Sequence, residues 1–153
     1  MPATDILARK EELAAKAVAL RAERNFNCAQ AVACALADEV GADFETCYRL
    51  SEGFGGGMGT HTETCGAISG AVIALSQLNS GGTEVSGTTK TATYQLVRTV
   101  VEGFQEMNGT TICRELKGVG NPEGMRRSCP GCIEDAVNLA VEVIAARAQQ
   151  DEN

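Results

Sequence analysis

The stretch TCGAISGAVIALSQL, residues 64–78, predicts a helix over about residues 65–78 whose surface is built mostly from small side chains. The distance between two packed helices depends on the side chains at their contact, so small residues let a neighbouring backbone or a bulky group come close. The small residues of this helix are Gly66, Ala67, Ser69, Gly70, Ala71 and Ala74.

The glycine-rich stretch GFGGGMG, residues 53–59, precedes this helix. Five of its seven residues are glycine, which is unfavourable in a helix, so the stretch predicts a loop. Backbone N–H groups of such a loop can converge on an anion or a sulfur cluster. We expect Gly56, Gly57 and Gly66 to do so beside Cys65. The alternative is a mobile connector whose glycines only turn the chain. The stretch is no Walker A motif, because GxxxxGK[ST] is absent.

Hydrophobic residues recur at helical spacing along the rest of the chain. We expect further helices at about residues 5–24, 28–40, from 43 onward, 88–107, around 113–116, and from 130 onward, with residues 149–153 frayed. No alternating strand pattern and no internal repeat is present. The prediction is an all-α fold: one domain over 1–153, a compact bundle of about five to seven helices with its core at about 5–148. The glycine-rich loop would lie between the third and fourth helices.

Composition limits the possible functions of the chain. It has 153 residues, 44% of them hydrophobic, and a net charge of −7. An acidic surface argues against nucleic acid and anionic membranes as partners. No segment reaches the roughly 18 apolar residues of a membrane helix, and the charged N-terminal stretch is no signal peptide. We therefore expect a cytoplasmic protein without membrane insertion, whose cysteines stay reduced unless they are catalytic or bind metal.

Five of the seven cysteines fall at or near predicted helix starts, where free backbone N–H groups and the helix dipole favour thiolate over thiol. Thiolates bind metals and attack disulfides. Cys129 and Cys132 form a CPGC motif, in which both sulfurs could pair or share a metal ion. By contrast, Cys34 and Cys47 lie among apolar residues inside helices, and we expect them in the core. The five cysteines near helix starts are Cys28, Cys65, Cys113, Cys129 and Cys132.

The single histidine, His61, lies four residues before Cys65. It could be a ligand or a proton carrier, or an exposed loop residue. The basic pair Arg126 and Arg127 precedes the CPGC motif. It could provide a positive field that stabilises the nearby thiolates, or it could lie in a solvated loop.

Several of these motifs occur together and in order: NCAQAV at 27–32, GFGGGMG at 53–59, TCGAISGAV at 64–72, ICREL at 112–116 and CPGCIEDA at 129–136. In this combination the chain resembles the C_GCAxxG_C_C family of redox-active proteins over about residues 20–145. The family's four characteristic cysteines carry over onto Cys28, Cys65, Cys113 and Cys129. Related domains are fused to cytochrome-like regions, which implies electron transfer through an iron–sulfur centre. The chain departs from the pattern at Cys132, where relatives more often lack cysteine.

Three hypotheses follow. In the first, Cys28, Cys65, Cys113 and Cys129 hold an iron–sulfur cluster for electron transfer, with Cys132 as an alternate or additional ligand. In the second, the protein is a metal-free thiol–disulfide protein in which Cys129 and Cys132 are the catalytic pair. In the third, the thiolates bind a structural zinc ion. Each redox hypothesis needs a partner redox protein, which the sequence does not identify, and a homodimer is also compatible with the sequence.

Overall fold

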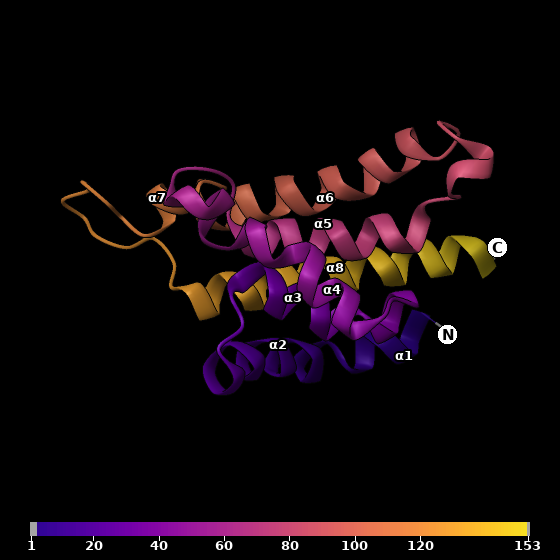
Figure 1. Cartoon of the computed structure of the whole chain (residues 1–153), viewed down its shortest axis with the longest axis horizontal. Helices are drawn as coiled ribbons and strands as arrows, with labels where there is room; N and C mark the ends of the chain where they lie inside the picture. The colour runs from indigo at the N-terminus through magenta and orange to yellow at the C-terminus, as the bar shows by residue number, and fades with distance from the viewer. Residues whose placement is uncertain (1–2, 153) are drawn as a thin grey trace.

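Helix α3 (Cys28–Leu36) is the buried centre of the fold, and every residue from 29 to 36 is buried. The computed structural model describes residues 3–152 (Figure 1). Helices α2, α4, α5 and α8 pack around α3. The other helices of the described chain are α1 (Ala3–Ala8), α2 (Lys10–Arg24), α4 (Phe44–Ser51), α5 (Gly66–Asn79), α6 (Lys90–Asn108), α7 (Cys113–Leu116) and α8 (Cys129–Glu152).

The all-α prediction is confirmed, since residues 3–152 contain eight α-helices and no strand. The count is slightly above the expected five to seven because the predicted helix 5–24 is divided at Arg9 into α1 and α2. The predicted helix 28–40 also ends early. Its last residues form a separate 3₁₀ turn, Asp38–Val40, which Gly41 terminates with a left-handed φ of 70°.

Small residues bring α5 against α3, as the sequence predicts. A β-carbon at Gly70 would lie 2.5 Å from the carbonyl oxygen of Ala29 and 3.0 Å from Cβ of Val32. The backbones of the two helices therefore approach more closely than larger side chains would permit. Helix α8 covers the other side of this pair and contributes the buried residues Ile133 and Val137.

The glycine-rich segment between α4 and α5 is more ordered than the expected loop. It contains a 3₁₀ turn, Glu52–Phe54, and a π-type turn, Gly57–His61. Met58 and His61 have φ values of 62° and 65° within it, a left-handed conformation that non-glycine residues rarely adopt. Such backbone occurs most often at functional sites, where surrounding structure maintains it.

Two further features complete the fold. The expected fraying of residues 149–153 is wrong for 149–152, which remain in α8, where Arg147 and Asp151 form an ion pair of 3.5 Å one turn apart. Residue 153 lies outside the described residues. Within the described chain, none of the helices combines the length and apolar character needed to cross a membrane.

Candidate functional site

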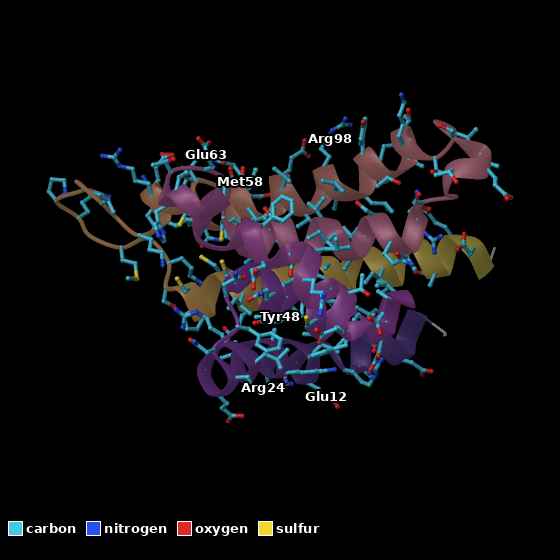
Figure 2. All side chains as sticks on the ribbon, viewed as in Figure 1. Glu12, Arg24, Tyr48, Met58, Glu63 and Arg98 are labelled. Atoms are coloured by element: carbon cyan, nitrogen blue, oxygen red, sulfur yellow. The ribbon has the colours of Figure 1, made fainter. Side chains whose placement is uncertain are left out.

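A cavity of about 360 Å³ opens at the end of the bundle where four helices begin. Five of the chain's seven cysteines line it, and Figure 2 shows sulfur atoms gathered beside the glycine-rich turn that carries Met58 and Glu63. The cavity thus brings together all five cysteines that the sequence singled out, from positions more than 100 residues apart in the chain. The lining residues are Arg21, Asn25, Phe26, Asn27, Cys28, Gly56, His61, Cys65, Gly66, Cys113, Leu116, Lys117, Arg127, Cys129 and Cys132.

A short antiparallel bridge joins the segments that carry Cys65 and Cys113. The N–H of Cys65 donates to the carbonyl of Thr111 at 2.8 Å, and the N–H of Cys113 donates to the carbonyl of Glu63 at 2.8 Å. These reciprocal bonds flank the bridge between Thr64 and Ile112. They hold the first turns of α5 and α7 side by side, so two cysteines 48 residues apart in sequence enter the cavity together.

Cys28 is placed by the start of α3. Asn27 caps this helix in a reciprocal capping box with Gln30, which orients its first turn. Burial raises the pKa of the Cys28 thiol, while the N–H groups of Gly56 and Ala29 donate to its sulfur and lower that pKa. The N–H of Gly56 is therefore one of the donors that the sequence predicts at this site.

The three predicted glycines have different places. Gly66 lines the cavity without a side chain, and a β-carbon there would overlap the sulfur of Cys28. Gly56 also lines the cavity. Gly57 is buried behind it, with its α-carbon so close to Cys113 that an added β-carbon would lie 2.6 Å from Cβ of Cys113. Gly57 therefore permits close packing and does not line the cavity.

Cys65 and Cys132 form a hydrogen-bonded thiol pair, both buried. The S–H of Cys132 donates to the sulfur of Cys65, and this bond lowers the pKa of Cys65. The N–H groups of Ala67 and Ile68, at the start of α5, lower it further. The same hydrogen bond, together with burial, raises the pKa of Cys132. In this pair, Cys65 is the more acidic thiol and Cys132 is the hydrogen-bond donor.

Cys129 makes a different contact from its neighbour in the CPGC motif. The ammonium of Lys117 donates a hydrogen bond to the sulfur of Cys129, and this bond raises the pKa of Lys117. Lys117 also lowers the pKa of Cys113, which burial raises. The sequence analysis missed Lys117. The sequence spacing could have pointed to it, because Lys117 follows Cys113 by four residues and therefore lies one helical turn beyond it.

Arg127 anchors the start of α8 and does not act as a free cation. Its guanidinium donates to both carboxylate oxygens of buried Asp135, at 3.1 and 3.2 Å, and lies 3.7 Å from Glu134. Asp135 also accepts a 3.1 Å bond from Asn108 at the end of α6. The network thus connects α6, α8 and the segment before the CPGC motif.

The remaining candidates lie where the sequence places them. His61 lines the cavity, and its ring lies against Gly56. Cys34 and Cys47 are buried in the core, away from the cavity lining. Burial raises the pKa of Cys34 to about 12, and its thiol donates to the carbonyl of Phe44 at 3.6 Å. These two thiols therefore serve packing.

The cavity brings thiols together without forming a closed metal site. Among residues 3–152, no three Cys, His, Asp or Glu side chains stand in a metal-binding group, and all seven cysteines are free thiols. However, the charge of each cavity thiolate raises the pKa of others: Cys65 and Cys129 act on Cys28, and Cys28, Cys65 and Cys129 act on Cys113. Burial is the larger cause of the raised pKa of Cys28 and Cys113, and the neighbouring thiolates add to it, so a bound cation would favour ionisation of the thiols.

Comparison with known proteins identifies a family for this chain. The family model described as "Putative redox-active protein (C_GCAxxG_C_C)" matches residues 26–143 and so spans all five cavity cysteines. Comparisons with curated proteins and with solved structures gave no match. The matched region covers most of the chain. The protein therefore belongs to the C_GCAxxG_C_C family of redox-active proteins.

Proposed function

We propose that the protein is an electron-transfer protein whose cavity thiolates hold an iron–sulfur cluster. One observation carries the proposal: five thiols from four separate helix starts line one cavity of about 360 Å³. A thiol–disulfide protein needs two cysteines, whereas four or five that converge from separate segments suit a thiolate-ligated metal centre. Cys28, Cys65, Cys113 and Cys129 would hold the cluster, with Cys132 as an alternate or additional ligand.

The charges around the cavity support this proposal. Ionisation of several thiols in one cavity would bring like charges together, and Lys117, which bonds Cys129, would offset only part of that charge. Metal cations would offset the rest, and binding them would deprotonate the thiols. The N–H groups that donate to Cys28 and Cys65 are the kind of backbone donor that tunes the potential of a cluster.

The bound cluster would supply one-electron transfer, and the residues around it would control its environment. Gly66 leaves room for the sulfur of Cys28 to approach the backbone, and Gly57 leaves room for the β-carbon of Cys113. Lys117 would hold a positive charge beside Cys129. His61 and Arg21, also part of the cavity lining, would control how solvent and a partner reach it.

The first experiment is metal analysis of protein purified without oxygen from iron-replete cells. We expect iron, acid-labile sulfide and visible absorption, and the loss of all three in Cys28→Ser, Cys65→Ser and Cys113→Ser. Cys47→Ala is the matched control, because Cys47 is buried in the core outside the cavity. Iron-free wild-type protein would contradict the proposal. Stoichiometric zinc without redox activity would indicate the structural zinc site instead.

A second candidate function rests on the hydrogen bond between Cys65 and Cys132. Here the thiolate of Cys65 would attack a partner disulfide, and Cys132 would resolve the mixed disulfide. The pair would lose two electrons and two protons, which convert the partner disulfide to two thiols. This pairing differs from the expected Cys129–Cys132 pair. Mass spectrometry of the oxidised protein distinguishes them, with a Cys65–Cys132 disulfide expected here.

A further inference from the structure

The side chain of His61 packs against the backbone of Gly56 in the wall of the cavity. A β-carbon at Gly56 would lie 2.8 Å from Cε1 and 3.1 Å from Nδ1 of His61, so the imidazole ring fills the space beside the Gly56 α-carbon. Both residues line the cavity. Within residues 3–152 the imidazole forms no hydrogen bond or salt bridge, so it acts on this wall by packing.

The backbone at His61 is strained. Its φ of 65° lies in the left-handed region, which a residue with a side chain rarely adopts. Gly56, Gly57 and Gly59 in the same turn also have positive φ values, which glycine adopts without cost. Glycine at residue 61 would remove the strain together with the ring. Strain of this kind persists at functional sites, which indicates that the ring of His61 has a role there.

Asn27 holds the same part of the wall from the other side. A β-carbon at Gly55 would overlap the side chain of Asn27, which therefore lies against the α-carbon of Gly55. Two hydrogen bonds fix this side chain, one accepted from the N–H of Gln30 and one donated to the carbonyl of Glu52, each 2.9 Å long. The peptide unit between Gly55 and Gly56 thus lies between a fixed amide side chain and the imidazole ring.

This peptide unit carries a hydrogen-bond donor of the cavity. Its N–H belongs to Gly56 and donates to the sulfur of Cys28. A peptide unit is planar, so contacts at both of its α-carbons limit the directions in which its N–H can point. The ring over Gly56 and the amide against Gly55 therefore favour the orientation that meets the sulfur.

We propose that His61 is a positioning residue for this donor: its ring holds the N–H of Gly56 toward the sulfur of Cys28 and thereby sets the reduction potential of the bound cluster. The inference rests on the proposed function, in which Cys28 is a ligand. A hydrogen bond to a ligating sulfur stabilises negative charge, and reduction adds one electron to the cluster. Loss of the bond should therefore lower the reduction potential.

The test variant is His61→Gly, because glycine adopts the same φ without strain and removes the ring. The measurement is a redox titration of the loaded protein, followed by visible absorption. At a fixed ambient potential we expect the ratio of reduced to oxidised cluster to fall about fivefold, the effect of one lost hydrogen bond of ordinary strength. His61→Phe keeps a flat ring and removes the nitrogen atoms, so its ratio should match that of the wild-type protein.

The matched control is Met58→Gly. Met58 has nearly the same φ, 62°, in the same turn, yet it is 50% exposed and lies in a separate groove beside Ile68 and Val72 (Figure 2 labels Met58). Its substitution relieves the same kind of backbone strain outside the cavity lining, and we expect no change in the ratio. An equal fall in both glycine variants would overturn the proposal, since the effect would then come from a more flexible backbone.

Two other results would also overturn it. A higher ratio in His61→Gly would show that the ring excludes water, because solvent stabilises the more highly charged reduced state. An equal fall in His61→Gly and His61→Phe would show that a ring nitrogen or its charge acts on the cluster. If His61→Phe fails to fold, the comparison of the two glycine variants and the amide measurement below still decide.

Hydrogen exchange of the Gly56 amide in metal-free, isotope-labelled protein separates this inference from the proposed function. The exchange should be about fivefold faster in His61→Gly, as expected for one weakened hydrogen bond, and unchanged in Met58→Gly. Iron-free wild-type protein with this exchange pattern would refute the cluster and leave the role of His61 in place. Iron-loaded protein in which His61→Gly changes neither the amide nor the potential would refute the positioning role alone.

Discussion

The sulfur of Cys28 lies against the α-carbon of Gly66, in the space that a β-carbon of residue 66 would occupy. This contact joins the first turns of α3 and α5. It explains why glycine follows Cys65: a β-carbon at residue 66 would overlap the sulfur of Cys28 and lie 2.9 Å from the carbonyl oxygen of Phe54, so the thiol and the backbone beside it would have to shift. The geometry of the cavity therefore requires glycine at residue 66 as well as the five thiols.

Substitution of Gly66 by alanine should disturb this contact. We expect Gly66→Ala to lower the free energy of unfolding by about 1–3 kcal/mol, since an extra methyl group in a packed site forces side chains and backbone to shift. It should also lower the iron content of the protein. Urea unfolding measures the first effect. Gly53→Ala is the control, because no atom lies within 4 Å of a β-carbon at Gly53. Equal free energies of unfolding for Gly66→Ala and Gly53→Ala would show that the contact between Cys28 and Gly66 does not contribute to stability.

Removal of the positive charge of Lys117 should make Cys129 less reactive. In Lys117→Met, the sulfur of Cys129 loses the hydrogen bond that the ammonium of Lys117 donates to it. A partly exposed ion pair contributes up to about 1 kcal/mol, which corresponds to a decrease of up to about fivefold in the rate of iodoacetamide alkylation at Cys129. The rate is measured by mass spectrometry on metal-free protein. Lys90→Met, at the start of α6, should leave this rate unchanged.

Cys132 should control the titration of Cys65. In the metal-free protein, the hydrogen bond from Cys132 lowers the pKa of Cys65 below the ordinary thiol value of 9.0. Because the folded pKa is lowered, ionised Cys65 stabilises the fold above the unfolded value, and this stabilisation disappears as pH falls through the folded pKa.

Cys132→Ala should therefore move the alkylation profile of Cys65 to higher pH, because the pKa of Cys65 rises without its donor. The measurement is the pH dependence of alkylation at Cys65, read by mass spectrometry. Cys34→Ala, which removes a core thiol outside the cavity, should leave the profile in place. An unshifted profile in Cys132→Ala would show that the hydrogen bond is absent in solution.

Asp135 should stabilise the start of α8. Its buried carboxylate accepts two bonds from Arg127 and one from Asn108. We expect Asp135→Asn to lower the free energy of unfolding by about 1–3 kcal/mol, because it weakens charge-assisted bonds at a buried position. Thermal unfolding provides the measurement. Glu134→Gln should cost much less, since Glu134 is half exposed and lies 3.7 Å from the same arginine. Equal losses would contradict this assignment.

Local sequence signals were sufficient to predict the helices and the cysteines at their starts. Asn27 with Gln30 forms a capping box, Asp43 caps α4, and Gly41 and Gly109 have the left-handed φ values that end helical segments. Each signal acts within one or two turns, so it can be recognised without knowledge of the rest of the chain. The division at Arg9 and the turns within residues 52–61 could not be predicted from the local pattern.

The pairing of side chains inside the cavity was determined by the tertiary structure. The CPGC motif suggests that Cys129 and Cys132 act as a pair, yet Cys132 bonds Cys65 and Cys129 bonds Lys117. The partners in the first of these contacts are 67 residues apart, so they meet only through the packing of α5 against α8. The sequence by itself determined which cysteines stand at helix starts, because capping and periodicity are local. Only the tertiary structure decided which thiol meets which partner, because that depends on how separate helices pack.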